Sequence, residues 1–300
     1  MSLMRVGSAL LWAVVLCATS ARAKDTLGFS IASLSNPFPA AVLEGARAAA
    51  DKLGVELVVV DAEEKTEKQT IDLEDLLKSQ ARAVLLYAVD PKQVAPSVEK
   101  ANLAEVPVIT IERAVSGAKV ACHVASDDAA GGRLVGEYLC RLLGGRGEVA
   151  ELQGSAGSAV ARRRGQGFGS ALRNCHGVRL AAIETAHSDR AEALTVTENL
   201  LQAHPAVGAV FAQDDEMALG ALHASRAGNH PVHIVGYGAT VDAVKAVEAC
   251  ELAATVDPQP ALMGRLAVEK AVALVKMKRL PEKTVSVEVA LKLVTSSDCK

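Results

Sequence analysis

The sequence predicts an α/β protein with two similar lobes, each built on a parallel sheet covered by helices. Short apolar runs alternate with longer amphipathic stretches along almost the whole chain after residue 24, and buried strands separated by helices are typical of parallel sheets. The pattern also repeats, because Glu44-Gly45-Ala46 in the first expected helix corresponds to Gln166-Gly167-Phe168 in the second half. A chain of 300 residues, half of them hydrophobic, has room for two such cores.

In the first half, two helix starts are marked by a capping residue followed by proline, at Asn36-Pro37 and at Asp90-Pro91. The cap accepts a backbone N–H, and proline at the first helical position loses no hydrogen bond. The helices expected from these and the apolar spacing are Phe38–Leu53, Lys65–Lys78 and Pro91–Asn102. The strands expected between them are Leu27–Ala32, Val55–Val60, Ala83–Tyr87, Val108–Ile111 and Val120–Val124.

The second half predicts the same alternation. Its expected helices are Asp127–Leu143, Val160–Asn174, Asp189–His204, Asp214–Ser225 and Val241–Ala249. Its expected strands are Glu148–Leu152, Val178–Ile183, Ala209–Ala212, Val232–Tyr237 and Ala253–Val256. The tail then predicts one long helix, Ala261–Lys278, and a single apolar strand, Val285–Val294.

The first 23 residues are predicted to be a secretory signal peptide. Arg5 supplies a positive charge, Ala9–Ala18 is a short apolar run, and Ala21-Arg22-Ala23 is an A-x-A cleavage site. The apolar run is too short to span a bilayer permanently. We therefore expect cleavage after Ala23 and a soluble, exported protein located in the periplasm.

The cysteines and the net charge bear on disulfide formation and on the kind of partner that the protein can bind. Five cysteines follow the leader, and none has C-x-x-C spacing: Cys122, Cys140, Cys175, Cys250 and Cys299. An exported protein can form disulfides, but an odd count leaves at least one thiol unpaired, and buried inert thiols are expected for most of them. A net charge of −3 with scattered charges argues against a nucleic-acid partner.

Polar side chains stand where several expected strands end, which is where open α/β sheets bind ligands. Asn36 and Asp214 can be ligand contacts or simple helix caps, and Tyr237 suits core packing as well as stacking. Glu112-Arg113 is more informative, because a charged pair directly after a buried strand must face a cleft or solvent. Residues 162–164 are three successive arginines of an expected helix, and only one of them can point into a cleft.

The sequence offers no enzyme, metal or nucleotide motif. Gly154-Ser155-Ala156-Gly157 follows a strand but lacks the G-x-G-x-x-G spacing, and there is no G-x-S-x-G elbow or P-loop. His230 and His233 form the only close histidine pair and have no neighbouring cysteine or carboxylate cluster. We therefore expect no catalytic residues, no metal and no cofactor.

Several stretches are similar to the type I periplasmic sugar-binding proteins of ABC importers, the family of the ribose-binding proteins. The densest are Ser35-Asn36-Pro37-Phe38, Val106-Pro107-Val108-Ile109-Thr110, Glu151-Leu152-Gln153-Gly154 and the run from Phe211 to Leu222. The resemblance extends from Lys24 to about Val294. It implies two Rossmann-like lobes, 24–126 with 259–287 and 127–258 with 288–300, joined by a three-segment hinge. The crossings would lie near 126–127, 257–259 and 283–288.

The resemblance also implies a set of ligand-binding residues. Asn36, Phe38, Arg113 and Arg164 match the family pattern, whereas Glu112 replaces an aspartate, Asp214 an asparagine and Tyr237 a phenylalanine. Gln259 takes the place of an expected glutamine after a one-residue shift. Other contacts are lost where the chain has Pro39, Ala88, Ser188 and Gly238. Because a polar group left without its partner costs roughly 1–3 kcal/mol, we expect a small sugar or sugar-like polyol other than ribose.

The resemblance implies that the loaded protein closes around its ligand and, as a monomer, delivers it to an inner-membrane ABC permease. An alternative is that the loaded protein acts as a sensor for a chemoreceptor or a histidine kinase. A DNA-binding regulator with the same fold is disfavoured, because the expected signal peptide stands where such a regulator needs a helix-turn-helix.

Overall fold

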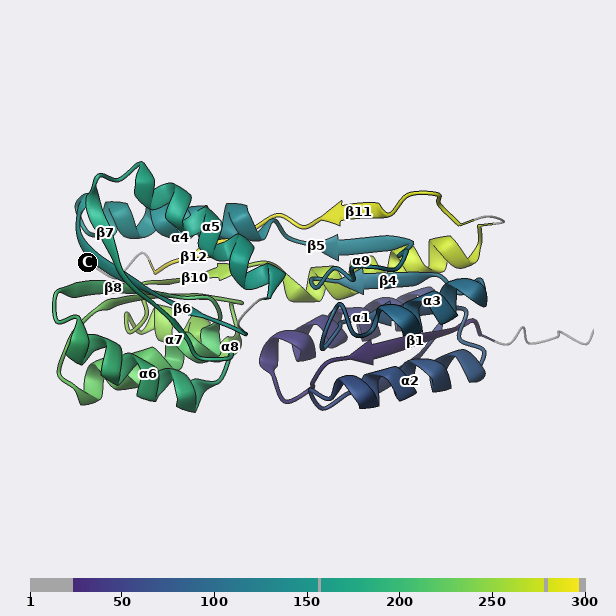
Figure 1. Ribbon diagram of the computed structural model, residues 1–300. Helices are drawn as coiled ribbons and strands as arrows, with labels where there is room; N and C mark the ends of the chain where they lie inside the picture. The colour runs from purple at the N-terminus through teal and green to yellow at the C-terminus, as the bar shows by residue number, and fades with distance from the viewer. Residues whose placement is uncertain (1–23, 156–157, 278–279, 297–300) are drawn as a thin grey trace, which may run out of the picture.

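The computed structural model describes residues 24–155, 158–277 and 280–296. The predicted signal peptide, Met1 to Ala23, therefore lies outside the described residues. Within them, the chain forms two α/β lobes that lie side by side along the long axis of the molecule (Figure 1). The predicted fold class is confirmed. None of the helices in the described part of the chain is long and apolar enough to span a membrane.

The first lobe is a six-stranded sheet in the order β11-β5-β4-β3-β1-β2, with every pairing parallel. Its strands are β1 (Thr26–Ile31), β2 (Glu56–Asp61), β3 (Ala83–Leu86), β4 (Val108–Ile111), β5 (Cys122–Ala125) and β11 (Val285–Glu288). One face packs on α1 (Pro37–Leu53) and α9 (Pro260–Val275), and the other packs on α2 (Thr66–Lys78) and α3 (Ala95–Leu103).

The second lobe has the sheet order β12-β10-β9-β8-β6-β7. Its strands are β6 (Arg146–Gln153), β7 (Gly177–Thr185), β8 (Val207–Ala212), β9 (His233–Tyr237), β10 (Ala254–Asp257) and β12 (Lys292–Val294). One face packs on α4 (Asp128–Leu142) and α5 (Ala159–Arg173). The other packs on α6 (Arg190–Ala203), α7 (Asp215–Ala227) and α8 (Val241–Glu248).

The chain passes between the lobes three times, and the last passage corrects one prediction. The first two passages follow β5 and β10, at 126–127 and 258–259. The tail was expected to form one strand, Val285–Val294, but it forms two: β11 joins the first sheet, and β12 pairs antiparallel with β10 in the second. A continuous apolar run can serve two sheets, so composition alone could not reveal that it is divided at 289–291.

The third helix also begins later than predicted. Pro91–Asn102 was expected to be helical, but α3 starts at Ala95. Asp90 Oδ1 accepts the backbone N–H groups of Lys92 and Gln93 at 2.7 and 3.0 Å, so it caps a turn rather than the helix. A capping residue followed by proline marks turns as well as helix starts, and this turn places Asp90 and Lys92 at the space between the lobes.

The repeat seen in the sequence corresponds to one close helix contact in each lobe. A Cβ atom added at Gly45 would lie 1.9 Å from the carbonyl oxygen of Ala261, and one at Gly167 would lie 1.9 Å from that of Ala129. Both distances are far below a normal contact, so α1 and α9, and likewise α4 and α5, pack backbone against backbone. Only glycine permits such an approach.

The expectation of buried, inert thiols is wrong for Cys140, Cys175 and Cys250, while the expected unpaired thiol is present at Cys122. Cys140 near the end of α4 forms a disulfide with Cys175 just after α5, with their Cα atoms 6.3 Å apart. Cys250 is disulfide-bonded as well, while Cys122 is free and buried. The spacing gave no hint of the first pair, because side-by-side packing of α4 and α5 brings their ends together.

Removing the Cys140–Cys175 disulfide is expected to lower the free energy of unfolding by roughly 3–4 kcal/mol. The bond closes a segment of 35 residues, and the chain-entropy model gives this value for a loop of that length. The measurement is urea unfolding of the Cys140→Ser/Cys175→Ser variant beside the wild type. A change below about 1 kcal/mol would contradict this prediction.

Candidate functional site

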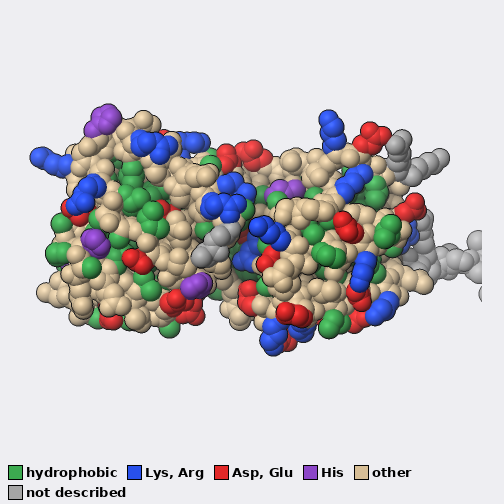
Figure 2. Space-filling model, viewed as in Figure 1, with side chains coloured by type: hydrophobic (Ala, Val, Ile, Leu, Met, Phe, Trp, Pro, Cys, Tyr) green, Lys and Arg blue, Asp and Glu red, His purple; other side chains and the backbone are tan. Residues whose placement is uncertain are grey.

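A cavity of about 690 Å³ lies between the lobes and is lined by side chains from both. In Figure 2 the surface is hollowed at this place, and basic side chains border the hollow. All but one of the predicted ligand-binding residues line it, namely Asn36, Phe38, Glu112, Arg113, Arg164, Asp214 and Tyr237. Polar residues from the carboxyl ends of strands in two sheets therefore meet at one cavity, as expected for parallel sheets.

Asn36 and Phe38 stand at the start of α1, where the chain turns out of the first sheet. Asn36 Oδ1 accepts the N–H of Phe38 at 3.0 Å, and Pro37 occupies the first helical position. The cap fixes the direction of the turn. Phe38 packs against Tyr87, with ring centroids 6.3 Å apart. Helix capping and cavity lining are thus compatible roles for Asn36.

Glu112 and Arg113 follow β4 in a tight turn. Glu112 has φ +56°, and the N–H of Arg113 donates to the carbonyl of Ile111 at 2.6 Å. This two-residue hydrogen bond defines a γ-turn, and a positive φ at its centre is a strained conformation. The Glu112 side chain is only 6% exposed. It accepts a hydrogen bond from the Tyr87 hydroxyl on one oxygen and pairs with Arg164 on the other.

Arg164 connects the two lobes through its buried guanidinium. Nε donates to Asp128 Oδ1 at 3.1 Å, Nη1 to the carbonyl of Gln213 at 2.8 Å, and Nη2 to Glu112 Oε1 at 2.8 Å. Its Cζ also lies 3.7 Å from the centroid of the Tyr237 ring. Because Glu112 belongs to the first lobe and Arg164 to the second, this ion pair bridges the cavity.

The electrostatics of this cluster follow from burial. Burial by itself would lower the pKa of Arg164, but Tyr237, Asp128 and Glu112 act against it, and the net pKa is raised. The guanidinium therefore stays charged. The pKa of Tyr87 is raised well above its usual value by burial and by Glu112. Tyr87 thus keeps its proton, as its hydrogen bond to the carboxylate requires.

The close contact between α4 and α5 holds Arg164 in place. A Cβ atom at Gly132 would lie 1.8 Å from the carbonyl oxygen of Arg164, so α4 presses directly on the backbone that carries the guanidinium. Ser158 caps α5 by accepting the N–H of Ala161. A rigid helix pair therefore carries the second-lobe side of the ion pair.

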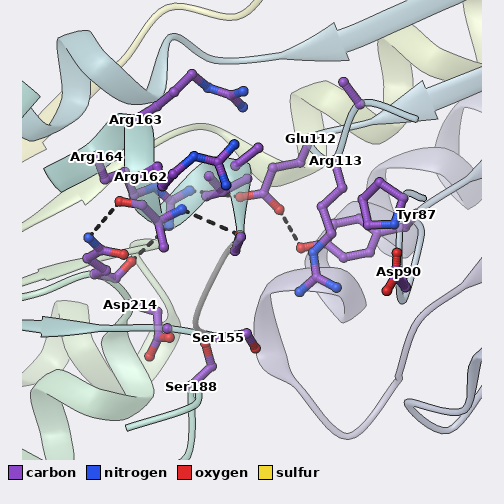
Figure 3. Close-up of a pocket in the computed structure, with 18 of the residues that line it drawn as sticks. Tyr87, Asp90, Glu112, Arg113, Ser155, Arg162, Arg163, Arg164, Ser188 and Asp214 are labelled. Carbon is purple, nitrogen blue, oxygen red and sulfur yellow. Dashed lines mark hydrogen bonds and ion pairs between the residues drawn. The ribbon is translucent and has the colours of Figure 1, made fainter. Parts of the chain in front are cut away.

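Arg113 lies across the cavity from Asp214 (Figure 3). Its Nη1 donates to the carbonyls of Ala88 and Val89 at 2.9 and 3.3 Å, and its Cζ lies 5.0 Å from the centroid of the Tyr87 ring. Within the described ranges, no carboxylate lies within ion-pair distance of it. Arg113 is thus held by main-chain carbonyls and an aromatic face, and Glu112 and Glu64 act on it electrostatically without forming an ion pair.

Asp214 caps α7 and also faces the cavity. Its Oδ1 accepts the N–H of Met217 at 2.9 Å, and Ser188 hydrogen-bonds to the same carboxyl group. Burial raises the pKa of Asp214, and these hydrogen bonds oppose the rise. As with Asn36, the structure confirms the cap and places the residue at the cavity, while its role as a ligand contact stays a prediction.

Gln259 lies outside this group. Its side-chain amide donates to the carbonyl of Ala290 at 2.6 Å, which joins the second and third passages between the lobes. It does not line the cavity described above. Its role as a ligand contact stays a prediction, and in the structure it lies in the second passage between the lobes.

Sequence reasoning missed three residues of the site. Tyr87 is the last residue of the expected strand Ala83–Tyr87 and was assigned no role, but its hydroxyl donates to Glu112. Asp128 lies in the expected helix Asp127–Leu143 and was assigned no role either, but it is 2% exposed and binds Arg163 and Arg164. The one sequence signal that could have identified Tyr87 as a site residue is its position at the carboxyl end of an expected strand, where ligands bind.

The third missed residue is Asp215, which organises the second lobe beneath the cavity. Its two oxygens accept the Thr255 hydroxyl at 2.6 Å and the Thr240 N–H at 2.7 Å. Asp215 thereby connects the start of α7 to β10 and to the loop after β9. Burial raises the pKa of Asp215 from 3.8 to about 6, although these hydrogen bonds oppose the rise.

The raised pKa of Asp215 predicts that stability falls as the pH rises from about 4 to 6. In that window the folded protein holds the proton that the unfolded chain releases, and the difference amounts to about 2–3 kcal/mol. The measurement is chemical unfolding at pH 4, 5, 6 and 7 for the wild type and Asp215→Asn. Subtracting the two curves removes the contribution of other buried acids, and equal pH slopes would contradict the assignment.

The chain has two lobes around a cavity, and an arginine of one lobe pairs with a carboxylate of the other. These features are those of a two-lobed solute-binding protein. The family model described as a periplasmic binding protein domain matches residues 27–279. The chain belongs to this family. It is therefore a periplasmic binding component of an ABC importer and not an enzyme.

Individual relatives agree with this assignment. The ribose import binding protein of Haemophilus influenzae is 40% identical over 92% of this chain and 94% of its own length. That of Escherichia coli is 41% identical over 90% and 93%. Among solved structures, the Caulobacter myo-inositol binding protein bound to myo-inositol has a TM-score of 0.84 at 30% identity, covering 91% of this chain and 94% of that chain. A Mycobacterium smegmatis solute binding protein with bound glycerol has a TM-score of 0.84 at 35% identity, covering 92% and 95%.

Proposed function

We propose that this protein binds a small sugar or sugar-like polyol between its lobes and delivers it to the permease of an ABC importer. The observation that carries the proposal is the cavity itself, which is lined from both lobes by hydrogen-bonding and aromatic side chains. Phe38 offers a ring to the apolar face of a sugar, while Arg113 and Asp214 offer groups to its hydroxyls; the Tyr237 ring, 2% exposed, is covered by Arg164. The names of the relatives, which include ribose and myo-inositol binders, support this ligand class.

Binding would be coupled to movement of the lobes. A ligand that touches both lobes stabilises the closed arrangement by the difference between its contacts in the closed and open forms. In this chain the ion pair of Arg164 and Glu112 connects the lobes. We infer that the ligand adds contacts around this pair, and that the permease recognises the closed lobe surfaces.

The ligand is proposed to be a compound other than ribose. Ala88 and Gly238 offer no side-chain acceptor at places where the family pattern implied an asparagine and an aspartate, and Pro39 and Ser188 offer no ring. Glu112, the remaining acid of the first lobe, is occupied by Tyr87 and Arg164. Two missing acceptors would weaken a ribose complex by about 10²-fold or more.

The test is a thermal-shift screen of the mature protein, residues 24–300, against pentoses, hexoses, polyols and sugar acids. A ligand at 100 times its Kd should stabilise the fold by about 2.7 kcal/mol, which gives a clear upward shift of the melting temperature. If ribose bound more tightly than every other compound, the specificity proposal would be wrong. If no compound shifted the melting temperature, the proposed ligand class would be wrong.

A further inference from the structure

The cavity is rich in hydrogen-bond donors and poor in available acceptors, which bears on the ligand's charge. Five basic residues line it, namely Lys92, Arg113, Arg162, Arg163 and Arg164, against three acids, Asp90, Glu112 and Asp214. A neutral sugar needs acceptors for its hydroxyl protons as well as donors for its oxygens. The number of hydrogen bonds that the three acids can still accept therefore decides how well a neutral sugar fits.

Two of the three acids are already occupied. Glu112 is 6% exposed, and its two oxygens bind Tyr87 and Arg164. Asp90 accepts two backbone N–H groups on one oxygen and the Gln93 amide on the other. Asp214 in turn accepts the N–H of Met217 and a hydrogen bond from Ser188, so its remaining acceptor capacity is limited as well.

Arg113 supplies the complementary observation. It is partly buried, and only its Nη1 donates to the described residues, so that the N–H groups on Nε and Nη2 have no partner there. A partly buried guanidinium with unpaired N–H groups is costly, and an edge with two parallel N–H groups matches a carboxylate in geometry. In Figure 3 this side chain reaches into the cavity opposite Asp214 and Ser188.

We propose that the ligand is a monoanionic sugar acid whose carboxylate pairs with Arg113 while its hydroxyls face Asp214 and Ser188. This inference rests on the proposed function and names the subclass of ligand. A single negative charge suits the site, because Asp214 on the opposite wall disfavours a second one. A sugar phosphate with two charges is thus a poorer match than a carboxylate.

The test compares matched acids and neutral sugars by isothermal titration calorimetry on the mature protein. The pairs are D-ribonate with D-ribose and D-glucuronate with D-glucose, and D-ribose 5-phosphate probes a dianion. At least one acid should bind ten times more tightly, or better, than its neutral counterpart and than the phosphate. Arg113→Gln should remove this preference, whereas Arg82→Gln, a surface arginine paired with Asp25, should retain it.

The outcomes separate the inference from the proposed function. Tighter binding of the neutral member in both pairs would overturn the inference and leave sugar binding intact, and so would tightest binding of the phosphate. A preference for acids that survived in Arg113→Gln would also overturn it. If none of these compounds nor any polyol bound, the proposed function itself would fall.

A second variant tests why neutral ligands are disfavoured. Tyr87→Phe removes the hydroxyl that occupies one oxygen of Glu112, so that oxygen becomes available to a sugar hydroxyl. The ratio of neutral-sugar affinity to acid affinity should then rise several-fold, while the circular dichroism spectrum stays unchanged. An unchanged ratio would contradict the role assigned to Tyr87.

Discussion

Replacing Arg164 with alanine is expected to abolish measurable ligand binding and to destabilise the protein by roughly 3–5 kcal/mol. The guanidinium pairs with Asp128 and Glu112, which are 2% and 6% exposed. Removing it leaves the buried Glu112 without a cation and leaves Asp128 with only the half-exposed Arg163, and breaking a buried pair in this way has a cost of that size. The binding loss follows because the substitution also breaks the ion pair between the lobes.

Urea unfolding and calorimetric titration measure the two effects of Arg164→Ala separately. Arg163→Ala is the matched control, because Arg163 binds the same Asp128 but is 41% exposed. An exposed partner contributes about 0–1 kcal/mol, so the control should remain close to the wild type in urea unfolding. Equal destabilisation by the two variants, or unchanged affinity in Arg164→Ala, would show that the bridging pair is not central to the site.

Replacing Arg113 with alanine is expected to weaken binding by about 10²-fold or more and to leave the melting temperature nearly unchanged. Its guanidinium holds two main-chain carbonyls beside the cavity and forms no ion pair with the described residues. Water can satisfy those carbonyls in the variant, whereas a ligand would lose a charged hydrogen-bond donor, a loss of about 1.5–3 kcal/mol or more for each bond.

Isothermal titration with the tightest ligand from the screen measures this effect of Arg113→Ala, and a thermal melt of the same sample reports the fold. The two arginines are therefore expected to differ. Arg113→Ala should affect binding alone, and Arg164→Ala should affect binding and stability together. Unchanged affinity in Arg113→Ala would remove this residue from the site.

Much of the fold follows from the local sequence. Alternating apolar runs and capped helices predicted nearly every strand and helix, and Gly45 and Gly167 marked the repeat that the structure explains as two close helix contacts. The errors arose where one local pattern fits two structures. The run Val285–Val294 serves two sheets, and Asp90-Pro91 starts a turn before α3.

The site was predicted by position more than by chemistry. Strand ends and the resemblance led to Asn36, Glu112 and Arg113, which do line the cavity. The sequence could not predict which residues form hydrogen bonds and ion pairs with these side chains, because the partners come from elements distant in the sequence. Tyr87 and Arg164 both bind Glu112, and no spacing rule connects a residue after β3, a residue after β4 and a residue of α5. Only the folded structure shows that both oxygens of Glu112 are bound, one by Tyr87 and one by Arg164. The proposed charge of the ligand depends on this observation.

The most direct test of the central claim, that a small solute is bound between the lobes, is a crystal structure of the mature protein with its tightest ligand. The account predicts that the ligand lies in the cavity, within hydrogen-bond distance of Arg113 from the first lobe and of a second-lobe group such as Asp214. A ligand bound elsewhere, or bound by residues of one lobe alone, would contradict it.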